Sequence, residues 1–574
     1  MTDKFQVSRV LREIASLLQV RGENAFKSRA YDVAADRIMG LPDDLGELVT
    51  QNRLQEVPGI GPKIAETISE LVNTGKSSHH EKLVQQFGLG SLELMRIPEL
   101  GPKKVAKLVE LGFGDLATLE TACAEGKLRE VKGFGEKTEE KILHNIAIMK
   151  RSAGKYRLGT VLPLAEELLA RVKAAPGVIR AEVAGSVRRR CEAVSDVDLV
   201  ASASEAGPVL EAFSSHGEVA ETLGRGNTKT SVRLRTGDIQ VDLRVLPDED
   251  FATALHHFTG SKAHHVKLRG LARQKGLTLS EYGLVSIVDA KKIPIEDEAA
   301  LYKALGLSYI APELREDWGE IEAALAGKLP ELLQLDDVRG VVHSHSTWSD
   351  GRDSLEDMAR AALAMGYGYL TVTEHSQTAF YAGGIKPDDL QRHWDEVDAV
   401  NEKVPGIKLL KGIETDILED GSLDYDDKIL EKMDVVIGSV HQRYKLDEDG
   451  MTKRILKAFD NPHLHIWGHA TGRLIHKREP YALRMEEVLD KAAEKRIAIE
   501  INGNPERLDL KADYVRLALE RGIRLTVSAD SHSTRELNYL QFAVDVARKG
   551  WAGPEHILNT LPVERFTAEL KSRR

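Results

Sequence analysis

Three side chains that commonly bind metal ions stand close together in the stretch VVHSHSTWSDG, namely His343, His345 and Asp350. Imidazole and carboxylate groups are typical ligands of Mn²⁺ and Zn²⁺. A short apolar run precedes them, so they are expected near the end of a buried β-strand. A single histidine is more often a core or surface residue, and the prediction of a metal site therefore depends on further ligands along the chain.

Six more residues of ligand type follow at intervals of tens of residues, each close to the end of an apolar stretch: His375, Glu414, His441, His469, Asp530 and His532. Apolar strand, ligand, helix and repeat is the layout of a β/α barrel, in which the strand ends meet on one face. Nine ligands are enough for up to three Mn²⁺ or Zn²⁺ ions that activate water and hold a phosphate. The pattern predicts a metal-dependent phosphoesterase.

A second group of carboxylates lies in the middle of the chain. Asp196 and Asp198 stand at i and i+2 in SDVDLV, so on a strand both point to one face. Asp242 in DIQVDLRV lies on another alternating stretch that is expected to pair beside the first. Three carboxylates can hold two Mg²⁺ or Mn²⁺ ions. A lone DxD pair often lies on a solvated strand, but Gly185 and Ser186, about ten residues earlier, favour a phosphate-binding site.

Three segments near the N-terminus share a glycine turn followed by a helical pattern: VPGIGPKIAETI, IPELGPKKVAKLV and VKGFGEKTEEKIL. Glycine lets the backbone approach a phosphate, and the N–H groups that open the next helix donate to it without reading a base. One copy is explained equally well as a plain helical packing unit, whereas three copies favour DNA binding. The predicted contacts are Gly59, Gly61, Lys63, Gly101, Lys103, Gly133, Gly135 and Lys137.

The length and composition set the limits of these interpretations. A chain of 574 residues is too long for one core and predicts several domains. No apolar run reaches the roughly 18 residues of a membrane span, so a cytoplasmic protein is expected. Cys123 and Cys191 are too isolated for a disulfide or a thiolate metal site. The net charge of −11 argues against DNA binding, but the acidic excess lies mostly in the C-terminal part.

The combined motifs resemble two known families. The Gly-Ser, DxD and later Asp pattern is similar to the nucleotidyltransferase superfamily. The three segments before it resemble helix-hairpin-helix motifs, and with HFTGSKAHHVKLRGLARQKGLTLSEYGL after it they narrow the resemblance to family X DNA polymerases over residues 1–320. Residues 337–574 resemble the polymerase and histidinol phosphatase (PHP) domain, and the nine ligand positions match its pattern.

The resemblance implies a multidomain fold with α-helical hairpin regions, an α/β nucleotidyltransferase palm with an α+β thumb, and a distorted, TIM-like β/α barrel. The implied boundaries are 1–90 for an N-terminal helical domain, 91–152 for a fingers-like helical subdomain with two hairpins, 153–255 for the palm, 256–320 for the thumb, 321–336 for a linker and 337–574 for the PHP domain.

The resemblance also implies roles for individual residues. Asp196, Asp198 and Asp242 would be catalytic metal ligands of the palm. The residues implied to bind the incoming nucleotide or the template are Gly185, Ser186, Arg189, Phe258, Gly260, His265 and Arg269, and the Gly260–Ser261 bond is expected to be cis.

Three positions depart from the animal members of the family. His257 replaces a tyrosine that helps to exclude ribonucleotides, which leaves sugar discrimination open, and Gln240 replaces an arginine beside the third aspartate. Thr67 replaces the lysine that forms a Schiff base in the deoxyribose-phosphate lyase reaction, and a threonine cannot form an imine. Lys63, one helical turn earlier, is the alternative amine.

The implied function is that of a bacterial repair polymerase, associated with the nucleoid, that adds dNTPs to gapped or primer–template DNA, as in base excision repair. The barrel would be a 3′–5′ exonuclease that processes DNA ends. Two alternatives stay open. The barrel can be a structural scaffold of a DNA-end-binding protein, or a phosphatase that acts on a small phosphate ester.

Overall fold

The computed structural model describes residues 4–39, 45–97, 100–151 and 153–572. The N-terminal helices enclose a core formed by residues such as Leu11, Ile14 and Ile68. A second helical unit follows with its own core around Leu108 and Ile142. The elements are α1 (Lys4–Val20), α2 (Ala25–Met39), α3 (Leu45–Thr50), η1 (Leu54–Glu56), α4 (Pro62–Thr74), α5 (Ser78–Phe87), α6 (Gly90–Leu94), α7 (Pro102–Glu110), α8 (Leu116–Ala124) and α9 (Glu136–Arg151).

Each of the three glycine segments leads into a helix. α4 and α7 begin at a proline, whose fixed φ suits the first helical position, directly after Gly61 and Gly101. α9 begins directly after Gly135. Gly59 has φ 92°, a left-handed conformation that other residues adopt only under strain. Pro98 and Glu99 of the second segment lie outside the described residues.

The palm is built on a five-stranded sheet of order β2-β4-β7-β6-β5, in which β4 and β7 run parallel. Alternate residues of β4 face opposite sides. Val197 and Leu199 join the core with α10 and α12, while Val200 packs against α13 on the other face. The elements are β1 (Tyr156–Arg157), α10 (Leu158–Lys173), β2 (Val178–Val183), α11 (Gly185–Arg188), β3 (Ala193–Val194), β4 (Asp196–Ala203), α12 (Ala206–Ser214), β5 (Val219–Arg225), β6 (Lys229–Leu234), β7 (Gln240–Leu246) and η2 (Asp248–Asp250).

The thumb packs helices against a three-stranded sheet of order β10-β9-β8. The segment 321–336, expected to be a linker, is packed rather than extended. Ile321 and Ala324 of α16 join the thumb core, and Leu333 joins the barrel core. The elements are α13 (Phe251–Thr259), α14 (Lys262–Gln274), β8 (Leu277–Ser280), β9 (Gly283–Ser286), β10 (Lys292–Ile293), α15 (Glu298–Ala304), η3 (Pro312–Leu314), α16 (Glu320–Leu325) and η4 (Leu335–Asp337).

The C-terminal part is a closed barrel of parallel strands in chain order, β11 to β17. Phe566 and Leu570 of α24 join a cluster with residues of several strands, among them Val342 of β11 and Tyr369 at the start of β12, and so cover the amino end of the barrel. Its strands are β11 (Gly340–Ser344), β12 (Tyr369–Val372), β13 (Lys408–Asp416), β14 (Val435–Ser439), β15 (Ile466–Trp467), β16 (Ala498–Asn502) and β17 (Leu525–Ser531).

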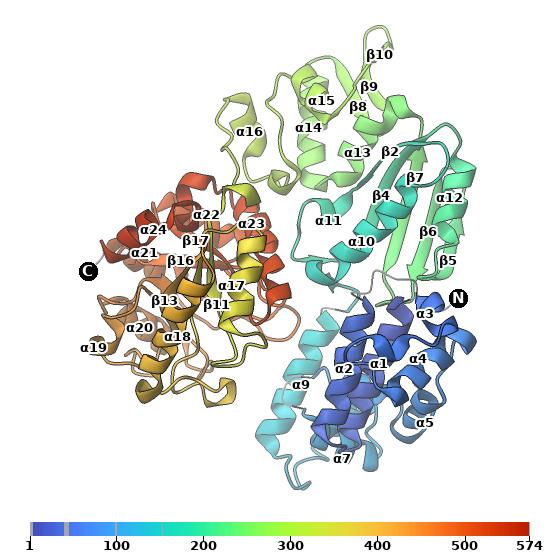
Figure 1. Ribbon diagram of the computed structural model, residues 1–574. Coiled ribbons are helices and arrows are strands. Elements are labelled where there is room, and N and C mark those ends of the chain that lie inside the picture. The colour runs from blue at the N-terminus through green and yellow to red at the C-terminus, as the bar shows by residue number, and fades with distance from the viewer. Residues whose placement is uncertain (1–3, 40–44, 98–99, 152, 573–574) are drawn as a thin grey trace.

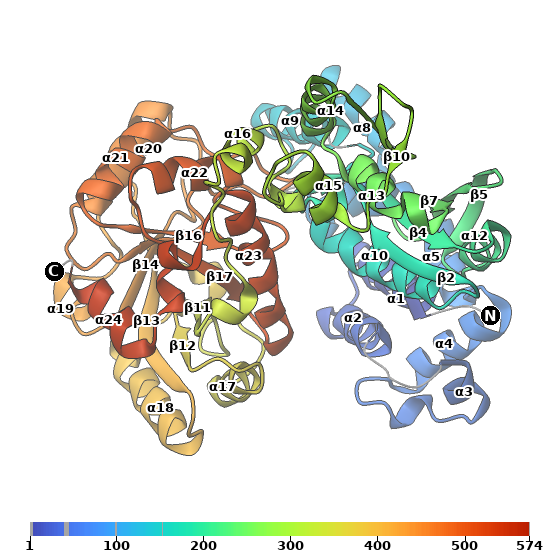
Figure 2. The same cartoon turned by 90° about the horizontal axis from the view of Figure 1, so that it is seen from above.

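Helices surround the strands of the barrel, as Figures 1 and 2 show. They are α17 (Leu355–Ala364), η5 (Phe380–Ala382), η6 (Pro387–Asp389), α18 (Leu390–Lys403), α19 (Asp427–Leu430), α20 (Glu448–Phe459), α21 (Met485–Glu494), α22 (Ala512–Glu520), η7 (Thr534–Tyr539), α23 (Leu540–Lys549), η8 (Pro554–His556), η9 (Leu558–Thr560) and α24 (Val563–Lys571). Among the described residues, no helix combines the length and the apolar character that a membrane crossing needs.

The barrel lies beside the palm and the thumb (Figure 2), and it packs against the palm. Phe542 of α23 packs against the palm core as well as the barrel core. Gly159, at the start of α10, lies so close to Pro505 that a Cβ atom on it would stand 2.4 Å from the Cβ of the proline. Glu192 and Arg473 form an ion pair of 2.7 Å across the same contact. The two parts therefore share a tight interface.

Candidate functional site

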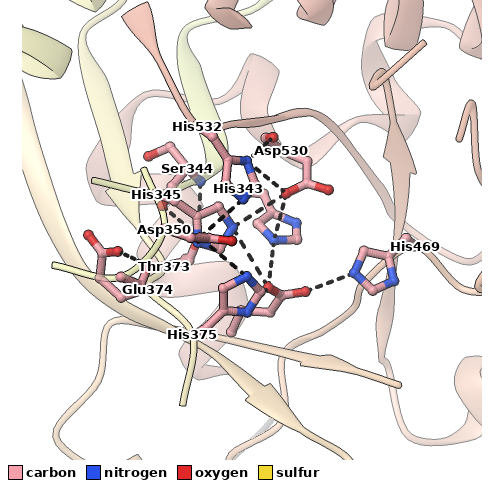
Figure 3. Close-up of polar contacts among 12 residues, drawn as sticks. His343, Ser344, His345, Asp350, Thr373, Glu374, His375, His469, Asp530 and His532 are labelled. Carbon is pink, nitrogen blue, oxygen red and sulfur yellow. Dashed lines mark hydrogen bonds and ion pairs between the residues drawn. The ribbon is translucent and has the colours of Figure 1, made fainter. Parts of the chain in front are cut away.

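The nine predicted ligands of the barrel gather at the carboxyl ends of its strands. Figure 3 shows histidine and carboxylate side chains from different strands that point toward one another. Three of the nine, His343, His469 and Asp530, have φ of 65°, 23° and 48°, a strained conformation for residues other than glycine. Strain of this kind is retained where the surrounding structure holds a side chain in a functional position.

Eight of the nine residues fall into three groups, in each of which the candidate ligand atoms lie within 4.8 Å of one another. His345 and His375 each belong to two groups, so the groups share ligands. The ninth residue, His469, places its Nε2 atom 2.9 Å from Glu414 and 3.2 Å from the Nε2 atom of His441. The groups are His345, Asp350, His375 and His532; His343, His345 and Asp530; and His375, Glu414 and His441.

The donor atoms of this centre fit metal ions. The Nε2 atom of His343, both ring nitrogens of His345 and the Oε2 atom of Glu414 are buried without a hydrogen-bond partner. Burial of unpaired polar atoms costs free energy, and native structures rarely contain several of them in one place. Metal ions coordinated by these atoms would remove that cost. The mixed imidazole and carboxylate set suits Mn²⁺ or Zn²⁺ better than Mg²⁺.

The charges of the centre are strongly coupled. Burial lowers the pKa of His345 to about 3, which keeps the ring in the neutral form that binds metals. Burial opposes protonation of His343 too, but the carboxylates of Glu500 and Glu414 hold its pKa well above the usual range. Burial would raise the pKa of Glu414, yet His441 and His343 hold it well below its usual range. In this structure His343 and His441 balance the charge of Glu414, whereas His345 stays neutral.

Residues that the sequence analysis missed orient these ligands. Glu500 in the middle of β16 lies 2.5 Å from the Nδ1 atom of His343, and Asp416 at the end of β13 lies 2.5 Å from the Nδ1 atom of His441. Arg507 lies 3.4 Å from Asp530. Carboxylates behind a histidine fix its tautomer and raise its affinity for metal. Glu500 is an acidic residue within the otherwise apolar stretch AIEI, and this is the signal that could have found it.

The three predicted carboxylates of the palm lie together. Asp198 and Asp242 are opposite one another on the parallel strands β4 and β7, and Asp196 is on the same face. A Cβ atom on Gly185 would stand 2.3 Å from the Oδ2 atom of Asp198, which explains the glycine at this turn. Burial, followed by repulsion from Asp196 and Asp242, raises the pKa of Asp198 to about 6.

A lysine that was not predicted completes this cluster. Lys229, the first residue of β6, lies 2.5 Å from Asp242, and Gln240 donates a 3.1 Å hydrogen bond to the same carboxylate. Although burial opposes it, these contacts hold the pKa of Asp242 below its usual range. The positive charge that an arginine at position 240 would place beside Asp242 is therefore supplied by Lys229 of the neighbouring strand.

Two arginines that follow Gly185 and Ser186 form ion pairs with residues of the thumb. Arg188 forms a two-pronged ion pair with Glu298 at 2.6 and 3.1 Å. Arg189, predicted to contact a triphosphate, donates to Glu316 at 3.1 Å and to the carbonyl oxygen of Thr259 at 2.5 Å. The structure therefore brings Arg189 beside the Thr259–Gly260 turn.

The predicted nucleotide residues of the thumb lie on α13 and α14. The Gly260–Ser261 bond is cis, as predicted. The Nδ1 atom of His257 lies 3.2 Å from the Nε2 atom of His265, and burial lowers the pKa of His265 to about 4. The ring of Phe258 lies 4.4 Å from the guanidinium of Arg244. Arg269 is part-exposed on α14.

All eight predicted DNA contacts of the three hairpins are exposed. No heavy atom other than chain neighbours lies within 4 Å of the position that a Cβ would take on Gly61, Gly101 or Gly135. Thr67 is buried and its hydroxyl donates to the carbonyl oxygen of Lys63, whereas the side chain of Lys63 is exposed. The hairpins therefore leave room for a phosphate backbone at their turns.

Comparisons with known proteins agree with this division of the chain. Residues 3–77 match a helix-hairpin-helix domain, 91–145 a SAM-like helix-hairpin-helix tandem, 254–316 the DNA polymerase beta thumb and 342–504 the PHP domain. A probable phosphatase of Thermoanaerobacter sp. (strain X514) is 29% identical over 222 residues, which are 34% of this chain and 87% of the relative. A probable phosphatase of Caldanaerobacter subterraneus is 27% identical over 267 residues, 44% of this chain and 96% of the relative.

One relative covers the whole architecture. The DNA polymerase/3′-5′ exonuclease PolX of Bacillus subtilis (strain 168) is 36% identical over 570 residues, which are 99% of each chain. The alignment therefore spans all the segments of this chain that match the hairpin, thumb and PHP models. The chain belongs to the family X DNA polymerases that carry a C-terminal PHP domain.

Proposed function

We propose that this protein is a DNA-directed DNA polymerase that fills short gaps during repair, and that its barrel is a metal-dependent 3′–5′ exonuclease that prepares DNA ends. The observation that carries the proposal is the presence of two separate ligand clusters, one on the palm sheet and one at the carboxyl ends of the barrel strands. The family relationship supports both activities.

In the palm, Asp196, Asp198 and Asp242 would hold two Mg²⁺ or Mn²⁺ ions. Bound ions would activate the primer hydroxyl and neutralise the triphosphate. The chain's own part is to position the nucleotide. Gly185 leaves space beside Asp198, and Arg189 would bind a phosphate once its present contact with Glu316 is exchanged. Phe258, Gly260 and His265 would border the sugar and base, and Arg269 the template strand.

In the barrel, the nine residues at the strand ends would hold up to three Mn²⁺ or Zn²⁺ ions. Bound ions would supply a nucleophile from water and neutralise the scissile phosphate. Glu500 and Asp416 hold the rings of His343 and His441 so that the Nε2 atoms face the centre. Arg507, whose Nη1 atom is buried without a hydrogen-bond partner, is positioned to bind a phosphate oxygen beside Asp530.

The hairpins would grip the DNA backbone on either side of a gap. Their exposed glycines and the lysines Lys63, Lys103 and Lys137 suit contacts that do not depend on base sequence. The buried Thr67 supplies no amine, so Lys63 is the candidate amine for lyase chemistry in this helix. Gapped DNA is an intermediate of base excision repair. The proposed place of action of this protein is therefore that pathway, at the nucleoid in the cytoplasm.

Two variants of the full chain test the proposal. Asp198→Ala should abolish primer extension and leave degradation of a 3′ end intact, whereas His345→Ala should do the reverse. The assay measures both activities on one gapped substrate in Mg²⁺ and in Mn²⁺. If His345→Ala degraded the 3′ end as fast as the parent protein, the barrel would be a scaffold.

A phosphatase that acts on a small phosphate ester is the second candidate for the barrel, because two relatives that match 34% and 44% of this chain are named probable phosphatases. Release of inorganic phosphate from p-nitrophenyl phosphate, compared with release of nucleotides from a 3′ end, separates the two candidates. The exonuclease assignment requires kcat/KM to be higher for DNA.

A further inference from the structure

Two neighbouring aromatic side chains are exposed beside the barrel's metal centre. Phe380 is 83% and Tyr381 67% exposed, and the only other exposed large apolar residue of the described barrel is Met365 at 38%. Leaving two large rings in water forfeits the free energy that burying them would give. The barrel has a large core in which other aromatic residues are buried, so the exposure of this pair needs an explanation.

The pair lies next to the metal ligands. The ring centroid of Tyr381 is 6.3 Å from that of His375 and 6.4 Å from that of His441. Both histidines belong to the group that includes Glu414. Phe380 precedes Tyr381 in the one-turn helix η5. A molecule that reaches the metal centre from this side passes the two rings.

The loop that carries the rings is firmly held. Ala379 and Ala382, which flank the pair, are buried. The hydroxyl of Thr378 donates to Asp416 at 3.0 Å, its amide donates to Asp424 at 2.8 Å, and Gln442 donates to its carbonyl oxygen at 3.0 Å. Asp416 is the carboxylate that orients His441. Asp416 therefore holds both this loop and the candidate ligand His441, while the rings of Phe380 and Tyr381 are exposed to solvent.

We propose that Phe380 and Tyr381 form a stacking platform for the unpaired bases at the 3′ end of a DNA strand. The inference rests on the proposed exonuclease function and deepens it, because it names the form of DNA that the barrel accepts. His343 and His345 are buried. A terminal phosphodiester whose nucleotides have left the duplex would therefore reach them more readily than a paired one. Rings at the entrance replace the stacking that those bases lose.

Stacking on aromatic side chains accepts any base, because every base has a π face. A platform of this kind selects ends by their pairing and not by their sequence. Mispaired termini unpair more readily than matched ones, so they occupy the platform more often. The barrel would then remove the ends that the palm extends poorly and would spare matched primers.

The test is a cycle of two proteins and two substrates. The full-length protein and its Phe380→Ala/Tyr381→Ala variant are given a single-stranded oligonucleotide with normal 3′-terminal bases, or one whose last two residues are abasic tetrahydrofuran sites. We expect kcat/KM of the parent protein in Mn²⁺ to fall about 5- to 100-fold on the abasic end, as stacking of one or two bases implies. The variant should be slow on both ends and should not distinguish them.

Three further measurements make the result decisive. Met365→Ala, which removes an exposed apolar side chain elsewhere on the barrel, should retain the full preference for bases. Tyr381→Phe should also retain it, since the ring and not the hydroxyl stacks. Equal melting temperatures and equal bound metal in the parent protein and the double variant establish that the fold and the centre are intact. A double variant that still prefers the normal end overturns the proposal.

A binding measurement without hydrolysis separates this proposal from the nuclease assignment. An oligonucleotide with 2-aminopurine at its 3′ end is mixed with metal-free protein, and quenching of its fluorescence reports stacking. Quenching in the parent protein and its loss in the double variant support the platform even if no nucleotide is released in Mn²⁺. If the parent protein causes no quenching, the rings serve another partner, and the platform is excluded.

Discussion

The guanidinium of Arg190 lies 3.3 Å from the carboxylate of Asp545, and this contact joins the palm to the barrel. Asp545 is on α23, which follows the candidate ligands Asp530, in β17, and His532, directly after that strand. A second link runs beside it, since Glu316 accepts from both Arg189 and Lys549. The turn that carries the predicted triphosphate arginine is therefore bonded directly to the helix behind the barrel's ligands.

The link through Lys549 should affect both stability and nucleotide binding. Lys549→Ala leaves Glu316 with one cation instead of two at a largely buried position, so we expect a loss of about 1–3 kcal/mol in the free energy of unfolding. The freed Glu316 should hold Arg189 more tightly and raise KM for dNTPs several-fold. Thermal denaturation and steady-state primer extension measure the two effects.

The matched control is Lys571→Ala. Lys571 lies 3.4 Å from Asp434 in an exposed pair, which typically contributes less than about 1 kcal/mol. This variant should keep both the melting temperature and KM of the parent protein. If the two substitutions had equal effects, the contact of Lys549 with Glu316 would have no role in nucleotide binding.

Each of the three palm carboxylates should be required for synthesis. Asp196→Ala, Asp198→Ala and Asp242→Ala are each expected to abolish primer extension, because the remaining pair cannot hold two ions, while affinity for gapped DNA changes little. Asp238→Ala, a change on the exposed turn before β7, is the control and should extend primers normally. Extension by Asp198→Ala within tenfold of the parent rate would contradict the assignment.

The dependence of synthesis on Mg²⁺ should change near pH 6. The pKa of Asp198 is raised to about 6 by burial and by Asp196 and Asp242, so below that pH the ion must displace a proton. The Mg²⁺ concentration for half-maximal synthesis should be nearly constant above pH 7 and should rise up to tenfold per unit below pH 6. A titration of Mg²⁺ at several pH values measures this. A flat profile down to pH 5 would contradict it.

The orienting residue Glu500 should be needed for metal affinity. Glu500→Gln removes the charge behind His343 while keeping its shape, and changes of this kind typically cost about 10- to 100-fold in affinity or activity. Bound Mn²⁺, measured by elemental analysis, and release of nucleotides from a 3′ end should fall together. His343→Ala should remove the exonuclease activity entirely while synthesis persists.

His463→Ala is the control for these substitutions. His463 precedes β15 and so lies toward the amino end of the barrel, opposite the ligands. It should leave bound metal and nuclease rate unchanged. Normal bound metal in Glu500→Gln would show that His343 holds its position without the carboxylate.

The two glycines of the first hairpin should respond differently to substitution. Gly59→Val forces a β-branched residue to φ 92° and should destabilise the N-terminal helical domain. Gly61 has φ −80° and open space at its Cβ, so Gly61→Val should fold normally and weaken binding to gapped DNA by hindering the phosphate. Fluorescence anisotropy at increasing salt measures this, because backbone contacts are salt-sensitive.

Gly207→Val is the control for Gly61→Val, because its Cβ position in α12 is equally open and far from the hairpins in the chain. It should bind gapped DNA like the parent protein. If Gly61→Val bound as tightly as Gly207→Val, the first hairpin would not contact the DNA backbone.

The sequence predicted which side chains gather at one face of the barrel, because these candidate ligands obey a simple rule. A parallel barrel brings every strand end to one face, so a ligand type at the end of each apolar stretch is enough to locate the centre. Glu500 lies in the middle of β16, so this rule does not find it, and its signal is an acidic residue within an apolar strand. The palm carboxylates were likewise predictable, since the i, i+2 spacing of Asp196 and Asp198 fixes their common face.

Contacts between distant parts of the chain could not be predicted from the sequence. Nothing in the local pattern of Lys229 indicates that it reaches Asp242, because that contact depends on the pairing of β6 with β7. The pairs of Arg189 with Glu316 and of Arg190 with Asp545 depend on how thumb, palm and barrel dock. The segment 321–336 was expected to be a linker from its composition, yet Ile321, Leu332 and Leu333 are buried in the cores that it connects.

The contact of Gly159 with Pro505 has a consequence for related chains. A side chain at position 159 would clash with the residue at position 505. A related chain with a residue larger than glycine there must therefore hold its barrel farther from the palm or at another angle. A polymerase that has lost its barrel is free of this restriction and can accept the helix-favouring alanine. The amino acid at this position of α10 therefore indicates whether the palm and the barrel of such a chain pack closely against one another.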